Sequence, residues 1–233
     1  MPDTSRPDFA SDDADLSNDG PNQNVATAEN LPDKPSFAEF RTLIRPLVRT
    51  QRIIKWVHIA FQIDTAFLEQ FSSLRQELRH DLNAWPTDIM RKLTSFKPAG
   101  VSFTNEQAEQ MRALMAAHKR ALMTDSFGEE YFNTLEDLAL YFIFLGIRPI
   151  WIVGAIRHVG NESINRVFAS KDSRGRQAKI FCLTTLMIME INQIQRVNIV
   201  FWELFSSAAD RREIVSDDIF AFIERWKGRT PLQ

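Results

Sequence analysis

Hydrophobic residues recur with the period of an α-helix along almost the whole chain after Ser36. Alternation with a period of two never persists, and no Asn-Gly or Asp-Gly pair lies between two apolar runs as a hairpin signal. Glycine is scarce, with 8 residues among 233. These features predict an all-α fold, and the balance of 44% hydrophobic to 25% charged residues is typical of one globular domain.

Local signals divide this helical pattern into segments. Thr104 and Gln107 have the spacing of a capping box, Gly146 is a helix stop, and Pro149 suits the first turn of the next helix. Gly175 follows Arg174 at a further break. The expected helices cover 37–61, 65–80, 86–95, 104–123, 129–145, 149–169, 176–206 and 210–226.

The first 35 residues differ from the rest of the chain. They are rich in Asp, Asn, Ser and Pro, and they carry eight acidic but only two basic residues. Such a segment buries too little apolar surface to offset the entropy of an ordered chain, so we predict a disordered acidic tail over 1–35. The expected domain covers 36–206, and a C-terminal helix with a short tail covers 207–233. The chain does not begin with basic residues followed by an apolar run, so we expect no secretory signal.

The sequence holds few residues that could carry chemistry. Four histidines, His58, His80, His118 and His158, are scattered without metal-ligand spacing, and Cys182 is the one cysteine. There is no phosphate-binding glycine loop and no nucleophile motif, so we predict no catalytic residues, no metal site and no enzyme. The part after residue 35 has a net charge of +4, which is too weak to indicate nucleic-acid binding. A lone, apolar-flanked cysteine fits a cytoplasmic protein.

The stretch from Leu138 to Ala155 is almost free of charge and has nearly the length of a membrane span. Gly146 and the Arg148-Pro149 pair divide it into two helices, and an arginine at the centre of a span costs a few kcal/mol (about 2.5 to 3.5 on insertion scales). We therefore expect a helix corner within the core, with Arg148 turned to solvent, and no membrane span.

The segment 176–206 is apolar on more than one face, which indicates a helix buried on several sides. Two interpretations remain open. The helix is either a central core element of one chain, or it also packs against its copy in a homodimer. For the second interpretation the expected interface residues are Leu183, Met187, Ile191, Ile194 and Phe201.

Residues 118–155 resemble the globin domain of the globin-coupled sensors, which are bacterial haem proteins of signalling. The family has a histidine in the helix before the haem-facing one, then Phe or Tyr, and then a haem-ligating helix ending in His-x-x-Ile-Gly-Leu/Ile-x-Pro-x-Trp-x-x-Gly-Ala. This chain has His118, Phe127 and Tyr131, followed by Phe142-Ile143-Phe144-Leu145-Gly146-Ile147-Arg148-Pro149-Ile150-Trp151-Ile152-Val153-Gly154-Ala155. The resemblance implies a globin-like fold with an extra N-terminal helix and a dimer-forming last globin helix.

The family's proximal histidine, which binds haem iron, is replaced here by Phe142, a side chain without a lone pair for a metal. The distal tyrosine corresponds most nearly to Met90. The resemblance thus places a ligand pocket at Phe142, Met90, Leu145, Trp151, Tyr131 and Phe127, and implies an apolar ligand or a filled pocket. Haem is the family's cofactor, and no cofactor is expected for this chain.

Three functions follow from the resemblance. The first is a haem-free regulatory or signalling module that acts as a dimer through an unidentified partner protein, with an apolar small molecule as a candidate ligand. The second is a haem-based oxygen sensor with another axial ligand, for which His80 and His118 are the spare candidates. The third is a helical scaffold without a ligand. The acidic tail and the helix at 210–226 are candidate docking elements for the partner.

Overall fold

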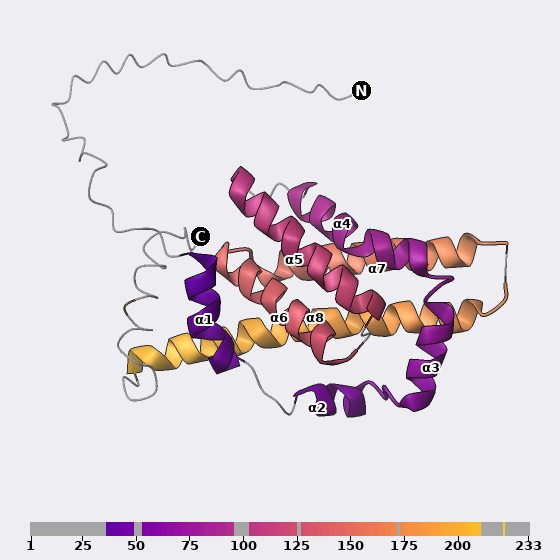
Figure 1. Cartoon of the computed structure of the whole chain (residues 1–233), viewed down its shortest axis with the longest axis horizontal. Helices are drawn as coiled ribbons and strands as arrows, with labels where there is room; N and C mark the ends of the chain where they lie inside the picture. The colour runs from indigo at the N-terminus through magenta and orange to yellow at the C-terminus, as the bar shows by residue number, and fades with distance from the viewer. Residues whose placement is uncertain are drawn as a thin grey trace, which may run out of the picture. The chain divides into compact units, whose positions relative to one another are not determined.

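The computed structural model describes residues 36–48, 53–95, 103–124, 127–171, 173–210 and 221, without the side chains of 53–56 and 204–210. Within these ranges the chain forms eight α-helices and no strand, which confirms the predicted all-α class (Figure 1). The helices are α1 (Phe37–Val48), α2 (Ile53–Ala60), α3 (Thr65–Leu74), α4 (Arg79–Ser95), α5 (Asn105–Thr124), α6 (Glu129–Phe144), α7 (Pro149–Ala169) and α8 (Arg176–Asp210).

Several predicted helix boundaries are confirmed by their local chemistry. The backbone N–H of Thr104 donates to Gln107 Oε1 (2.9 Å), and that of Gln107 donates to Thr104 Oγ1 (3.2 Å), which completes the capping box. Pro149 is the first residue of α7. Gly146 and Gly175 have φ of 70° and 61°, a left-handed conformation that glycine adopts at little cost. The sequence therefore specifies these ends locally.

The predicted division of the N-terminal helices is wrong. The single helix expected over 37–61 is two helices, since α1 ends at Val48 and α2 begins at Ile53. Farther on, α3 ends at Leu74, and α4 begins at Arg79 and continues through Pro86 rather than starting there. An internal proline removes one helix hydrogen bond, but Trp85 and Pro86 are both buried, so tertiary packing offsets that loss.

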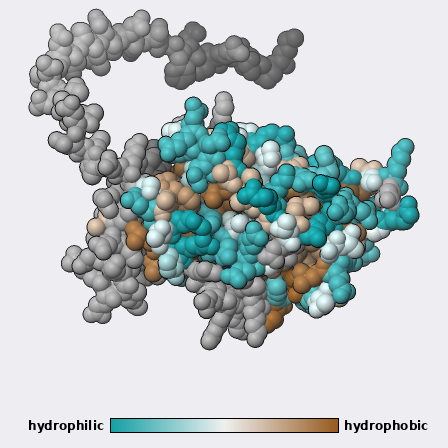
Figure 2. Space-filling view, in the orientation of Figure 1, coloured by the Kyte–Doolittle hydropathy of each residue, from teal (hydrophilic) through white to brown (hydrophobic). Residues whose placement is uncertain are grey.

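Two helix pairs form the centre of the fold. α7 packs along α8 and α5 along α6, while α4 contacts both α5 and α7 (Figure 1). The approach of α7 to α8 depends on Gly160, because a Cβ atom there would lie 2.5 Å from Sδ of Met187. The core formed between the helices is apolar, and hydrophilic side chains cover most of the described surface in the view of Figure 2.

The predicted corner in the apolar stretch 138–155 is confirmed. α6 ends at Phe144, α7 begins at Pro149, and Arg148 between them is exposed. Within the described ranges, no helix combines the length and the apolar character needed to cross a membrane.

Arginine side chains hold α1 to the helices that it contacts. Arg41 of α1 donates two hydrogen bonds of 2.7 Å to the carboxylate of Asp137 in α6. Arg196 of α8 donates to Glu136 Oε1 (3.0 Å) and to the carbonyl of Val48 (2.9 Å), the last residue of α1. The guanidinium thus satisfies a carbonyl at the negative end of the helix dipole. α1 is therefore held to both α6 and α8.

Two predicted segments lie outside the described residues. These are the acidic tail over 1–35 and, except for residue 221, the C-terminal helix expected over 210–226. α8 extends to Asp210, beyond its predicted end at Ser206.

Candidate functional site

Phe142, which we expect to replace the iron-binding histidine, lies in the last turn of α6 and is 1% exposed. The turn closes by a pair of hydrogen bonds, from Gly146 N to the Ile143 carbonyl and from Ile147 N to the Phe142 carbonyl, each 2.9 Å long. This is the Schellman arrangement, which needs the left-handed Gly146. The sequence of the corner therefore determines the backbone conformation at Phe142. The ring of Phe142 belongs to the hydrophobic core.

The other predicted pocket residues do not all gather around Phe142. Tyr131 and Phe127 are fully buried, but Tyr131 precedes Phe142 by eleven positions of α6, or about 16 Å along the helix axis. Met90, Leu145 and Trp151 are partly buried against the core. Phe127 and Tyr131 lie at the beginning of α6, whereas Phe142 and Leu145 lie at its end, so these four residues do not gather at one point of the fold.

Phe127 and Tyr131 belong to an aromatic cluster at the beginning of α6. The ring of Phe127 lies 4.8 Å from that of Phe71 and 5.4 Å from that of Tyr131, between ring centroids. Phe127 has φ of 64°, which is rare for a residue with a side chain, and its carbonyl accepts a 2.8 Å hydrogen bond from His58 Nε2. Burial of the ring holds this strained backbone in place.

A buried polar network lies beside this cluster, and its centre is Glu190 of α8. The carboxylate accepts hydrogen bonds from Trp85 Nε1 (2.8 Å) and His118 Nε2 (3.1 Å). The other ring nitrogen of His118, Nδ1, lies 3.1 Å from Thr134 Oγ1. The network joins α4, α5, α6 and α8 in the core, where a carboxylate requires such partners.

Thr134 links His118 to the backbone of α6. Its Oγ1 lies 2.9 Å from the Tyr131 carbonyl oxygen and 3.1 Å from the Glu130 carbonyl oxygen. The same Oγ1 lies 3.1 Å from Nδ1 of His118, so both ring nitrogens of His118 have a hydrogen-bond partner.

The hydroxyl of Tyr131 is the unsatisfied group of this region. Tyr131 is 0% exposed, and its phenol oxygen has no hydrogen-bond partner in the described part of the chain. Burial, and then the negative charge of Glu190, raises the pKa of Tyr131 well above its ordinary value. The phenol therefore stays protonated across the physiological pH range.

The described residues do not fit a haem held by an axial histidine. Phe142 has no donor atom, and both ring nitrogens of His118 are engaged by Thr134 and Glu190. His80 is exposed, and exposed His158 contacts Glu162 (3.0 Å). Among the described residues, no group of three His, Cys, Asp or Glu side chains is arranged to hold a metal ion. The fourth histidine, His58, contacts the carbonyl oxygen of Phe127 through Nε2 (2.8 Å).

The predicted interface residues of α8 lie mostly inside the chain. Leu183, Ile194 and Phe201 are buried in the core, and Met187 and Ile191 are partly buried. The large apolar side chains that α8 exposes are different ones, namely Phe181, Ile188, Ile199 and Trp202. Any contact of α8 with a second chain would therefore use these residues.

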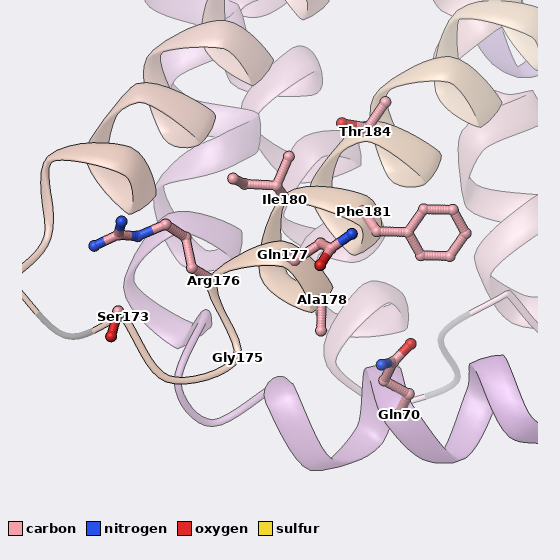
Figure 3. A pocket seen from close by; sticks show the side chains of 9 residues that line it. All are labelled: Gln70, Ser173, Gly175, Arg176, Gln177, Ala178, Ile180, Phe181 and Thr184. Carbon is pink, nitrogen blue, oxygen red and sulfur yellow. The ribbon is translucent and has the colours of Figure 1, made fainter.

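An open groove of about 790 Å³ lies where the beginning of α8 meets α3. Figure 3 shows Gln70 on one side and the ring of Phe181 on the other, with Arg176 near the preceding turn. None of the six residues predicted to form the ligand pocket is among its lining residues.

Sequence reasoning missed Glu190 and Trp85. Glu190 is the only acidic residue between Arg176 and Trp202, in a helix whose apolar residues indicate burial on several sides. A single carboxylate on such a helix was a signal for a buried polar partner, but nothing in the sequence names His118 and Trp85 as those partners.

Comparison with known proteins agrees with the fold. The sequence model of the Protoglobin family matches residues 50–194, which includes α2 to α7 and the first half of α8. No curated protein and no solved structure matches the chain. Because the family match covers more than half of the chain and the fold is all-α, the chain belongs to the protoglobin family.

Proposed function

We propose that this protoglobin is a regulatory module that does not bind haem in the usual way and that acts as a homodimer on a partner protein. The single observation that carries the proposal is the burial of Phe142, the residue that the sequence resemblance aligns with the family's iron ligand. The one buried histidine among the described residues, His118, supports it because its two ring nitrogens already have partners.

The buried contacts supply a route from the core to α8. Thr134 of α6 contacts His118 of α5, which contacts Glu190 of α8. A ligand or partner that shifts α6 near Phe142 would move this network. The movement would change the equilibrium between alternative positions of α8. The side chain of Phe142 is apolar, so a ligand bound near it would be an apolar small molecule.

Haemin titration of the purified protein tests the haem-free part of the proposal. We expect no sharp Soret band and no stoichiometric uptake for the wild type, whereas Phe142→His should gain both because it restores the missing donor. A stoichiometric Soret band from the wild type would overturn this part. Loss of such a band in His118→Ala or His80→Ala would then identify the substitute ligand.

Native mass spectrometry of the same preparation tests the remaining parts. A dimer mass is expected, and an added mass of a few hundred daltons would identify a bound apolar molecule. A monomer mass would contradict the dimer. A dimer with no added mass, even after incubation with a fatty acid, would favour the ligand-free scaffold.

A further inference from the structure

The groove between α3 and the beginning of α8 combines apolar and hydrogen-bonding side chains. Its apolar part comes from Ala178, Ile180 and Phe181. The ring of Phe181 is 52% exposed, although it packs against that of Phe67 with 5.8 Å between the ring centroids. Gln70 of α3 and Gln177 of α8, both exposed, add amide groups that can donate and accept hydrogen bonds (Figure 3). The groove therefore offers an apolar contact surface beside polar groups.

The charge at one end of this groove is positive. Arg176 is the one charged residue of the described lining, and its Nη2 donates to the neutral carbonyl of Ser170 (2.8 Å), which does not compensate the guanidinium charge. Residues 171–179, which cover the turn after α7 and the first turn of α8, carry four basic residues and one acidic residue. Lys171 and Arg174 in this segment are exposed. An acidic group that approaches this end of the groove is therefore attracted.

The shape of the groove favours a chain segment over other ligands. Sites for small molecules enclose most of the surface of the ligand, whereas this groove of about 790 Å³ is open to solvent. A lipid bilayer is too flat to reach the bottom of a groove between two helices. Peptide segments commonly bind in such grooves, with an apolar side chain as the anchor and arginine as the partner of acidic groups. A peptide is therefore the class of ligand that matches the shape.

We propose that this groove binds an acidic peptide segment of the partner protein. One apolar side chain of the segment would pack on Phe181 and Ile180, and a carboxylate would lie beside Arg176. The main chain of the segment would form hydrogen bonds with the amides of Gln70 and Gln177. The proposal rests on the proposed function, which includes a partner protein, and it names the surface and the kind of segment that binds there.

Peptide selection on the full chain tests the proposal. Short random peptides displayed on phage are selected on the immobilised protein. We expect the enriched sequences to combine several acidic residues with a large apolar one. A synthetic, fluorescein-labelled copy of an enriched peptide then gives the dissociation constant by fluorescence anisotropy, and its affinity should fall as salt is added, because salt screens the charges.

Two matched charge variants locate the peptide on the surface. Gln177→Glu places a negative charge in the groove and should weaken binding about fivefold or more. The fold should tolerate it, because a glutamate suits the first turn of a helix. Gln195→Glu makes the same change at another exposed position of α8, about 27 Å farther along the helix axis, and should bind the peptide as the wild type does.

A second pair of variants tests the apolar anchor. Phe181→Ala removes most of the exposed apolar surface of the groove and should weaken binding about tenfold or more, since a buried aromatic contact usually dominates a small interface. Ile150→Ala, at a 67% exposed position at the beginning of α7, is the control and should leave the affinity unchanged. Circular dichroism of each variant checks that it is folded.

The outcomes separate this proposal from the proposed function. Equal binding by all four variants would place the peptide elsewhere, which overturns the groove and leaves the partner protein. Enriched peptides without acidic residues would overturn the proposed chemistry of the segment. If no peptide is enriched, the groove is not a peptide site. Sedimentation with phosphatidylserine vesicles that Gln177→Glu abolishes would then identify a lipid surface instead. The Soret band and the solution mass test the proposed function independently of these results.

Discussion

Nε2 of His118 lies 3.1 Å from Oε1 of Glu190, and the two side chains are 3% and 2% exposed. A second His–Glu pair, His158 with Glu162, has a similar separation of 3.0 Å, but its side chains are 45% and 39% exposed. The chain therefore holds a buried and an exposed version of the same contact.

We expect His118→Ala to destabilise the fold by about 3 to 5 kcal/mol, because it leaves Glu190 as a buried charge with one remaining donor. His158→Ala is the matched control and should cost less than about 0.5 kcal/mol. Urea unfolding of the two variants measures both values. Equal losses would show that the buried pair does not differ from the surface pair.

The two tyrosines provide a second matched comparison. Tyr131→Phe removes a buried hydroxyl without a partner, so the variant should be as stable as the wild type or more stable by up to about 2 kcal/mol. Tyr141→Phe removes a hydroxyl that donates to the Gln107 carbonyl at 2.9 Å, and it should lose about 0.5 to 1.5 kcal/mol. Thermal unfolding compares them. A clear loss in Tyr131→Phe would mean that its hydroxyl has a partner.

The stability of the protein should decline in alkaline solution. Burial raises the pKa of the Cys182 thiol from an ordinary value of 9.0 to about 11. Between these two pH values the unfolded thiol has lost its proton while the folded one keeps it, so rising pH favours unfolding, by at most about 1.4 kcal/mol per pH unit for one group. Cys182→Ala should show a shallower decline in melting temperature. Identical slopes would contradict the assignment to Cys182.

Gly160 sets the distance between α7 and α8. In Gly160→Ala the new Cβ would meet Met187 Sδ at 2.5 Å and Cβ at 3.3 Å, so we expect a loss of about 1 to 3 kcal/mol from overpacking. Met187→Ala in the same chain should recover part of that loss, since it removes Sδ and Cγ, the two closest atoms, and leaves only Cβ at 3.3 Å. A double-mutant cycle by urea unfolding measures the coupling, and additive effects would contradict a direct contact.

Some of the fold was predictable because its signals are local. The capping box of Thr104 and Gln107, Pro149 at the first position of α7 and the left-handed Gly146 each act within a few residues. The predicted N-terminal helix boundaries were wrong because tertiary packing, and not local sequence, decides them. Pro86 reads as a helix start, and burial beside Trp85 keeps it inside α4.

The sequence by itself determined the all-α class and the corner at Gly146 to Pro149. Only the tertiary structure decided which residues meet. Trp85 and His118 reach Glu190 across 105 and 72 residues of chain, and no local propensity encodes such a contact. The structure also decided which side of α8 is exposed, because that choice depends on how α1, α3, α6 and α7 surround it.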